Sequence, residues 1–442
     1  MSNPLKNNPE LKCVKAKDYC LSVRDGTHDS PKPVDIGFPL VTSKHLKSGQ
    51  IEINTCYQVS EVDYYEIVKR SKVDQWDVLI SMIGTIGEVA LVKNEPHFAI
   101  KNVGLFKSRN EAGGKWLYYY LRTDFAQNYL REISRGTTQQ YVPLGSLREM
   151  PVYVFDDKSE MSRIAHILGT LDDKIENNRK TAKTLEAMAQ AIFQSWFVDF
   201  DPVRAKMAGE SKESICKRLK LTPEILDLFP DRLVDSELGE IPEGWEVGNL
   251  GNIAKNVRRT ISPSSIGQNT VYIALEHMPR QSVALHEWDI ADSVESNKFY
   301  FRKGEILFGK LRPYFHKVGI TPTAGICSTD ILVIIPKSTE WLGFSLCHLS
   351  SKELVAYADS GSTGTRMPRT NWNELAKYMV VIPSEQLARK LNEIIQTQIE
   401  QIISITHVNR SIKTLRDALL PKLISGEIRV SDAQWMLEEV LL

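Results

Sequence analysis

The feature that most constrains the fold of this 442-residue chain is an internal duplication. Residues 135–143, a glycine followed by hydroxyl and amide side chains, are similar to residues 360–368. Three pairs of residues in and after these segments are separated by 225 positions: Gly136 and Gly361, Pro143 and Pro368, and Tyr153 and Tyr378. Further matches occur in the same order upstream and downstream, at offsets of 228 and 230: 77–80 with 305–308, and 183–185 with 413–415. Such an ordered set is hard to obtain by chance, so the sequence predicts two similar halves.

Each half is predicted to end in a long helix. Apolar residues recur every three or four positions from 159 to 196 and from 384 to 419, with Ser384 as the expected N-cap of the second helix. At 1.5 Å per residue each helix is about 55–60 Å long. Because each apolar stripe needs a partner, we expect the two helices to pair with each other in antiparallel orientation. Asn178 lies in the first stripe, where it either fixes the register of the pair or faces solvent.

Short apolar runs between glycines and prolines predict strands in both globular parts. They are 78–82, 89–92, 152–155, 271–274, 305–308, 331–335 and 379–382. The predicted fold class is therefore α+β, with two similar mixed α/β lobes joined by two long antiparallel helices in a coiled-coil rod with pseudo-twofold symmetry. The predicted organisation is a first lobe (1–155), a first long helix (156–205), a linker (206–240), a second lobe (241–383), a second long helix (384–425) and a C-terminal tail (426–442).

Charge and hydropathy exclude several classes of protein. Lys+Arg and Asp+Glu both total 55, so net charge gives no argument for nucleic acid, although a neutral total can hide a basic face. No run approaches the roughly 18 apolar residues that span a membrane, and residues 1–12 lack the apolar core of a signal peptide. The six cysteines form no Cys-x-x-Cys pair. We expect a cytoplasmic protein.

No motif favours catalysis by this chain. Residues 304–310 have the spacing of a phosphate-binding loop, but their middle positions are apolar and Leu311 replaces the Ser or Thr that binds Mg²⁺. The string Asp172-Asp173-Lys174 is similar to the carboxylate–lysine pairs of metal nucleases, but it lies in the middle of a predicted helix without a third carboxylate, so we expect a solvated helix face. No glycine-rich cofactor fingerprint or adenine methyltransferase motif occurs. We expect no catalytic residue, metal or cofactor in the chain itself.

Two features indicate contact with DNA. Amide and guanidinium groups in the repeated segments suit base edges (Gln139 and Gln140 for adenine, Arg366 for guanine), and the threonine hydroxyls suit phosphates; ordinary turn chemistry is the alternative. In the second lobe, basic residues are expected to gather around Tyr314 and His316, the alternative being a solvated strand face. These basic residues are Lys298, Arg302, Lys303, Lys310, Arg312 and Lys317.

Several further stretches carry a resemblance to a known family: residues 24–31 (RDGTHDSP), 40–46 (LVTSKHL), 136–141 (GTTQQY), 168–175 (LGTLDDKI), 196–202 (WFVDFDP), 241–245 (IPEGW) and 423–428 (LISGEI). Across essentially the whole chain, the pattern resembles the specificity subunit of type I restriction–modification systems. The segment 41–45 has only a loose counterpart at 273–277 in the second lobe.

The resemblance implies a non-catalytic subunit in a bacterial or archaeal cytoplasm. Each lobe would recognise one half of a bipartite, asymmetric site in double-stranded DNA. The helices would space the lobes and dock two methyltransferase subunits. S-adenosylmethionine, ATP and Mg²⁺, with adenine-N6 methylation and ATP-dependent cleavage, would belong to the methyltransferase and restriction subunits. The alternative is an elongated coiled-coil scaffold with protein-binding lobes. The candidate DNA-binding residues are His28, Lys44, His45, Arg135, Thr137, Thr138, Gln139, Gln140, Tyr141, Lys310, Arg312, Tyr314, Ser362, Thr363, Arg366 and Arg369.

Overall fold

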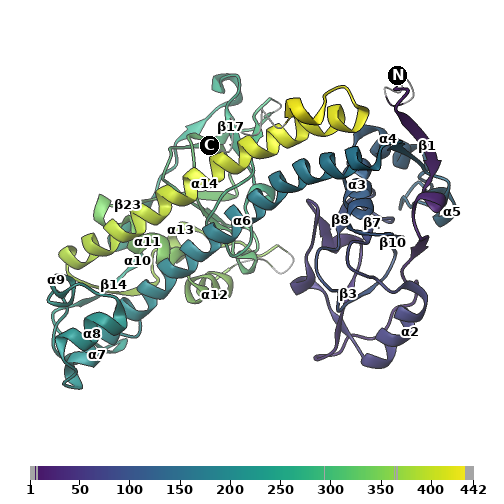
Figure 1. Cartoon of the computed structure of the whole chain (residues 1–442). Coiled ribbons are helices and arrows are strands. Elements are labelled where there is room, and N and C mark those ends of the chain that lie inside the picture. Colours follow the sequence, from purple (N-terminus) through teal and green to yellow (C-terminus); the bar gives the residue numbers. More distant parts are fainter. Residues whose placement is uncertain (1–4, 6–7, 293, 363, 365–366, 434–442) are drawn as a thin grey trace. The chain divides into compact units, whose positions relative to one another are not determined.

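The computed structural model of the chain describes residues 5, 8–292, 294–362, 364 and 367–433. The chain divides into two compact units, residues 1–174 with 412–442, and residues 175–411. Two long helices, α6 (Lys158–Phe197) and α14 (Glu385–Ser425), run through both units, so each unit contains one lobe and a part of each helix (Figure 1). The predicted α+β fold with two long helices is confirmed. In the described part of the chain, no helix has the length and apolar character needed to cross a membrane.

The lobe of the first unit is built on a four-stranded sheet with the order β2–β10–β7–β8, and a second, antiparallel pair joins β1 to β11. β3 pairs in parallel with β9 in a three-stranded sheet of the order β6–β3–β9. The elements are β1 (Leu11–Lys15), α1 (Ala16–Tyr19), β2 (Ser22–Asp25), β3 (Phe38–Val41), β4 (Leu46–Lys47), β5 (Gln50–Ile51), β6 (Gln58–Val59), α2 (Glu61–Ser71), β7 (Val78–Ser81), β8 (Val89–Leu91), β9 (Ala99–Ile100), β10 (Val103–Lys107), α3 (Glu111–Leu121), α4 (Asp124–Ile133), α5 (Leu144–Arg148) and β11 (Pro151–Phe155).

The lobe of the second unit repeats this plan, with the sheet order β15–β23–β20–β21, the antiparallel pair β14–β24 and the parallel pair β17–β22. Short helices and a hairpin precede it. The elements are α7 (Asp201–Met207), α8 (Lys212–Leu219), α9 (Pro223–Leu226), β12 (Leu233–Ser236), β13 (Gly239–Pro242), β14 (Glu246–Asn249), α10 (Leu250–Ile253), β15 (Ala254–Asn256), β16 (Thr260–Ile261), β17 (Val271–Ile273), β18 (Asp289–Ile290), β19 (Lys298–Phe301), β20 (Ile306–Gly309), β21 (Val318–Ile320), β22 (Gly325–Cys327), β23 (Ile331–Pro336), α11 (Leu342–Leu349), α12 (Lys352–Ser360), α13 (Trp372–Leu375) and β24 (Met379–Ile382).

The backbone corrects one part of the predicted duplication. Immediately before β11 the carbonyl of Met150 accepts a hydrogen bond from Ala16 N (2.8 Å), and immediately before β24 the carbonyl of Tyr378 accepts one from Leu250 N (2.9 Å). Met150 therefore corresponds to Tyr378, which is an offset of 228 rather than 225. The expected pairing of Tyr153 with Tyr378 is wrong, because the register places Val381 in the position of Tyr153.

The same correction applies to the glycines. Gly136 and Gly364 both adopt positive φ, +95° and +102°, whereas Gly361 has φ −82° at the end of α12. Gly364 is therefore the counterpart of Gly136, again at an offset of 228. By the same offset the counterpart of Pro143 is Asn371 and not Pro368. Pro143 is the N-cap residue of the short helix α5, and Asn371 is that of α13.

The two long helices pair in antiparallel orientation within each unit. In the second unit Asn178 Nδ2 donates to Asn409 Oδ1 (2.8 Å), and Asn409 is only 5% exposed. Asn178 therefore faces the partner helix rather than solvent, which favours the register-fixing role. In the first unit Asp172 forms an ion pair with Arg416 of α14. The expectation that Asp172 belongs to a solvated helix face is wrong.

Aromatic residues close the end of α6 inside the second unit. Phe197 packs against Trp245 with ring centroids 5.6 Å apart, and Trp196 packs edge-on against Phe229 at 5.6 Å. The helix ends at Phe197 because Phe200 adopts a left-handed conformation (φ 56°) and Pro202 then occupies the first turn of α7. Ser384 caps α14 by accepting a hydrogen bond from Leu387 N (3.3 Å), as the sequence predicts.

Candidate nucleic-acid interface

The first lobe presents the loop 135–141 as a closed, exposed turn. Arg135 and Tyr141 exchange two backbone hydrogen bonds (2.9 and 2.8 Å), and the four residues between Gly136 and Tyr141 are all exposed. A Cβ atom on Gly136 would lie 2.5 Å from the carbonyl oxygen of Gln139, so both space and backbone conformation require glycine here. The side chains of Thr137, Thr138, Gln139 and Gln140 are thus held at the tip of a turn whose base is fixed.

This turn is attached to the end of a central strand. Val142 N donates to the carbonyl of Met82 (2.9 Å), immediately after β7, and Gly84 N donates to the carbonyl of Gln140 (3.2 Å). Tyr141 also forms an isolated β-bridge with Ile83. A polar loop on a rigid sheet is the arrangement in which binding groups are usually found.

The second lobe presents the corresponding loop in the same way. Arg369 bridges to Leu311 just after β20, Arg312 N donates to the carbonyl of Pro368 (2.8 Å), and Thr370 N donates to that of Lys310 (3.1 Å). Ser362 is half-buried and its Oγ donates to the carbonyl of Asp359 (2.7 Å). The candidates Thr363 and Arg366 lie outside the described residues.

Cations outnumber carboxylates at the base of the second loop. Arg369 is exposed and lies 3.5 Å from Asp330, and Lys310 is half-buried beside both. Burial lowers the pKa of the Lys310 ammonium, Asp330 opposes this effect, and the charges of Arg258 and Arg369 lower the pKa further. At Lys310 the charges of two arginines therefore act against that of one carboxylate, and this excess of positive charge suits a phosphate.

Arg258 is a residue that the sequence-based search missed. It is exposed and adjacent to Arg259, whose guanidinium is turned inward in a bidentate pair with Glu305 (2.7 and 2.8 Å). The Arg258-Arg259 pair is visible in the sequence, but it lies about 50 positions before Lys310, so only the fold brings the two together.

The predicted basic cluster around Tyr314 and His316 is largely wrong. Lys298 is 8% exposed and its Nζ donates to Ser296, while Lys317 is half-buried and donates to the carbonyl of Leu275. His316 is half-buried with Nε2 2.9 Å from the carbonyl of Ser350. Tyr314, 51% exposed, remains available, whereas the Nε atom of Arg312 is buried; Arg302 and Lys303 are exposed.

The candidates near the start of the chain differ in accessibility. The side chain of His28 is 61% exposed, and its Nε2 lies 3.0 Å from Asp25 Oδ2. The other carboxylate oxygen, Asp25 Oδ1, accepts a hydrogen bond from Arg70 (2.6 Å). Lys44 is exposed. His45 is a correction to the candidate set, because it is 2% exposed and its Nδ1 accepts a hydrogen bond from Thr42 N (2.9 Å).

His277 of the second lobe makes the same backbone contact as His45: its Nδ1 accepts a hydrogen bond from Ala274 N (3.0 Å). The loose match between segments 41–45 and 273–277 is therefore a structural equivalence. In both lobes a histidine closes the turn after the strand that pairs in parallel, β3 or β17.

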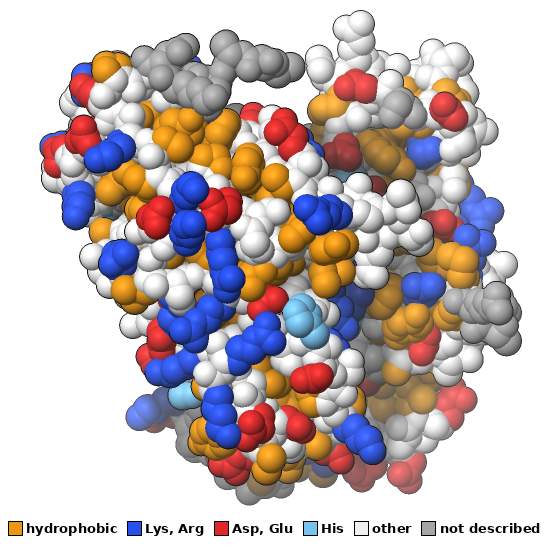
Figure 2. Space-filling view, turned by 90° about the vertical axis from the view of Figure 1, so that its right-hand side faces the viewer, with side chains coloured by type: hydrophobic (Ala, Val, Ile, Leu, Met, Phe, Trp, Pro, Cys, Tyr) orange, Lys and Arg blue, Asp and Glu red, His pale blue; other side chains and the backbone are white. Residues whose placement is uncertain are grey.

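The face of the first unit that Figure 2 shows is mixed rather than uniformly basic. Figure 2 views the side on which α2 and α5 lie in Figure 1, and Lys and Arg side chains there are interspersed with acidic and hydrophobic ones. Several cations are neutralised locally; Lys15 and Lys17, for example, share the carboxylate of Glu149 at 2.6 Å each. DNA binding through this face would therefore depend on particular side chains more than on a general positive potential.

The enzyme-like motifs take on other roles in the fold. The phosphate-loop match of residues 304–310 passes through β20, in the middle of a sheet, so its amide groups pair with neighbouring strands instead of wrapping a phosphate. Within the described residues, no group of three or more His, Cys, Asp or Glu side chains is placed to hold a metal ion.

Comparisons with known proteins find similar sequences and a similar fold. Residues 36–187 match the family model described as "Type I restriction modification DNA specificity domain". The specificity subunit of the type I restriction enzyme MjaIX from Methanocaldococcus jannaschii is 26% identical over 80% of this chain and 78% of its own length. That of HindI from Haemophilus influenzae is 27% identical, over 71% and 77% respectively. The crystal structure of a type I restriction–modification S subunit from M. genitalium has the same fold, with a TM-score of 0.52, 15% identity, and coverage of 96% of this chain and 99% of that one.

Proposed function

The chain belongs to the specificity subunits of type I restriction–modification systems, and from this premise we propose that its two lobes each recognise one half of a bipartite DNA target. One observation carries the proposal. In both lobes an isolated β-bridge, Ile83–Tyr141 or Leu311–Arg369, fixes a loop just after the same strand of the sheet, β7 or β20, and of the second loop the described residues Gly364, Met367 and Arg369 are exposed. The two lobes therefore share one backbone arrangement, which we call the loop frame, but hold different side chains on it. Such a pair suits two half-sites of different sequence.

The chemistry of the two loops supports different roles for their side chains. The amide groups of Gln139 and Gln140 can pair with adenine, and Arg369 can pair with guanine or a phosphate. Lys310 and Arg258, at the base of the second loop, are better suited to phosphates, which position a protein without specifying sequence. The other exposed candidates are His28, Lys44, Arg135, Thr137, Thr138, Tyr141 and Tyr314.

The remaining activities of such a system are assigned to partner subunits. We propose that two methyltransferase subunits dock on the paired helices and that restriction subunits join them, in a bacterial or archaeal cytoplasm. S-adenosylmethionine, ATP and Mg²⁺ would bind those partners, which would carry out adenine-N6 methylation and ATP-dependent cleavage. Family membership does not favour the alternative, a scaffold whose lobes bind only proteins.

A lobe exchange tests the proposal. Residues 1–155 are replaced by the first lobe of another specificity subunit, and the methylated adenines are mapped in cells that express the assembled complex. We expect one half of the target to change while the other half and the gap stay the same. The matched control exchanges the second lobe, 241–383, and should change only the other half. A change in both halves from either exchange, or a complex that methylates without sequence preference, would contradict the proposal.

A further inference from the structure

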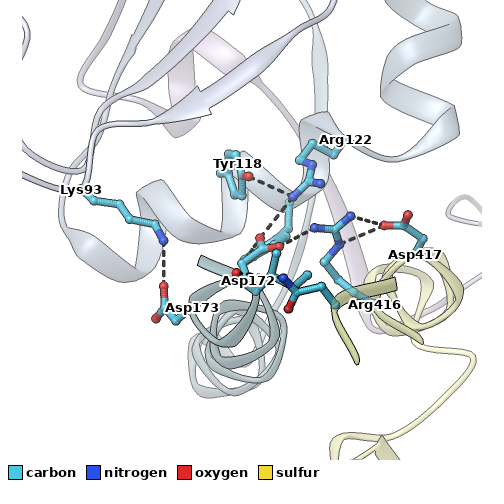
Figure 3. Close-up of polar contacts among 10 residues, drawn as sticks. Lys93, Tyr118, Arg122, Asp172, Asp173, Arg416 and Asp417 are labelled. Atoms are coloured by element: carbon cyan, nitrogen blue, oxygen red, sulfur yellow. Dashed lines mark hydrogen bonds and ion pairs between the residues drawn. The ribbon is translucent and has the colours of Figure 1, made fainter. Parts of the chain in front are cut away.

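One carboxylate joins three helices of the first unit. Asp172 of α6 accepts hydrogen bonds at Oδ2 from Tyr119 Oη (2.9 Å) and Arg122 Nη1 (3.3 Å), both at the C-terminal end of α3 in the lobe. Its other oxygen, Oδ1, accepts from Arg416 Nη1 of α14 (2.5 Å). Figure 3 shows Arg122 of the lobe, Asp172 of α6 and Arg416 of α14 converging.

The cluster is buried and balanced in charge. The side chains of Arg416, Asp172 and Arg122 are 10%, 15% and 19% exposed, and Asp417 supplies a second carboxylate to Arg416 (2.6 and 2.9 Å). Burial opposes the charged form of Arg416, but the two carboxylates outweigh it and raise its pKa. Without Asp172, two guanidinium groups would face each other with only Asp417 beside one of them, so the geometry depends on this one side chain.

The contacts that surround the cluster are less directional. Ile164, Leu168 and Leu171 of α6 are buried in the first unit, and the hydrophobic effect that favours their burial has no preferred direction. Hydrogen bonds to a shared carboxylate are directional, because they weaken steeply with angle. Arg122 is itself held by Tyr118 Oη (2.9 Å) and lies 5.0 Å from the centre of that ring, so the lobe side of the cluster is fixed in turn.

We propose that Asp172 is the positioning residue that holds the first lobe at one angle on the paired helices, and thereby determines how strictly the gap between the two half-sites is measured. The inference rests on the proposed function, since a gap exists only if two half-sites are recognised. In this account Asp172 touches no base. It acts through α3, whose orientation carries the loop 135–141 with the rest of the lobe.

The neighbouring residue provides a matched control. Asp173 pairs with Lys93 at 2.7 Å, but the two side chains are 60% and 38% exposed, and a screened surface pair contributes little to orientation. Asp173→Asn therefore removes a carboxylate from the same helix turn without touching the buried cluster. Tyr119→Phe removes one of the two hydrogen bonds from the lobe to Asp172 and leaves both the Arg122–Asp172 bond and the Asp172–Arg416 pair of the two helices in place.

The test measures gap selectivity in the assembled complex. Dissociation constants are determined for duplexes that carry the mapped target with its own gap and with the gap shortened or lengthened by one base pair. For Asp172→Asn we expect the preference for the correct gap to fall about tenfold, while the mapped half-sequences stay unchanged. Tyr119→Phe should lower the preference about threefold, because one hydrogen bond to a charged group is lost. Asp173→Asn should leave the preference as in the unmodified complex.

Two results would overturn the inference. The first is an unchanged gap preference in both Asp172→Asn and Tyr119→Phe. The second is an equal loss of affinity on all three duplexes with a lower melting temperature, which would mean that the cluster only stabilises the fold. If Asp172→Asn fails to fold, Tyr119→Phe alone decides. Absence of any bipartite target in the unmodified complex would instead refute the proposed function, so the two failures are distinguishable.

Discussion

Lengthening both long helices together should lengthen the gap in the DNA target. The perturbation inserts four helix-forming residues after Lys174 in α6 and four after Ser411 in α14, at the boundary between the two units. On α6 the contact residues Asp172 and Asn178 are six positions apart, and on α14 their partners Arg416 and Asn409 are seven apart. The two segments therefore match within one residue, and equal insertions keep them matched.

The expected magnitude follows from helix geometry. Four residues add about 6 Å and about 40° of rotation, so the apolar stripes stay nearly in phase and the helices should still pair. One base pair rises about 3.4 Å, so the gap should grow by about two base pairs with both half-sequences unchanged. Methylation mapping of the assembled complex measures this directly.

The control inserts the same four residues into α6 alone. The Asp172–Arg416 and Asn178–Asn409 contacts would then be out of step by about 6 Å and could not form together, so we expect methylation to be lost. An active complex with the double insertion and an unchanged gap would show that the helices do not set the spacing.

Three further predictions concern single side chains. Glu186 is half-buried in the second unit, and burial raises the pKa of its carboxyl above 4.5 although Ser282 Oγ donates a hydrogen bond to it (2.8 Å). Its contribution to stability is therefore present below about pH 4.5 and is lost as the pH rises through the raised pKa. Glu186→Gln should raise the melting temperature at pH 7 and not at pH 4, and no gain at pH 7 would contradict this. Gln140→Ala should cost about 1–3 kcal/mol of binding and relax discrimination at one base, whereas equal weakening on all sequences would identify a phosphate contact. Arg369→Ala should lower the slope of log affinity against log salt by about 1 if Arg369 binds a phosphate; an unchanged slope with altered base preference would assign it to a base edge.

The sequence predicts the large elements of this fold because their signals are long and repeated. Each predicted strand has a counterpart in the structure, and both long helices occur with Ser384 as the cap of the second. The exact alignment of the two halves could not be predicted in the same way. Gly361 and Gly364 are three positions apart with hydroxyl residues around both, and only the backbone conformation shows which of them replaces Gly136.

Helical periodicity also has a limit that Asp172 illustrates. The spacing of apolar residues identifies the face of α6 that meets α14, and it assigns Asp172 to the remaining, polar face. In the first unit Asp172 is nevertheless contacted by Tyr119 and Arg122 of the lobe and by Arg416 of α14, which a periodicity within one helix cannot reveal. A buried carboxylate between two arginines and a tyrosine therefore has the same local sequence signature as a solvated one.

The candidate interface could be predicted as a pair of exposed loops but not as a set of reading residues. Exposure of Thr137 to Gln140 follows from turn composition, whereas the burial of His45 depends on the parallel strand pair beside it. Arg258 reaches the second loop only through the sheet.

At equivalent positions of the bridged loops, the two lobes hold side chains of different chemistry. At the offset of 228, Met82 corresponds to Lys310 and Tyr141 to Arg369, although both pairs occupy the same bridged frame. The frame is conserved in space because its backbone hydrogen bonds and its glycine of positive φ are insensitive to the side chains around them. Side chains can therefore change from neutral to cationic without moving the loop. A duplicated frame of this kind separates the position of a reading group, which the fold determines, from its chemistry, which each lobe varies independently.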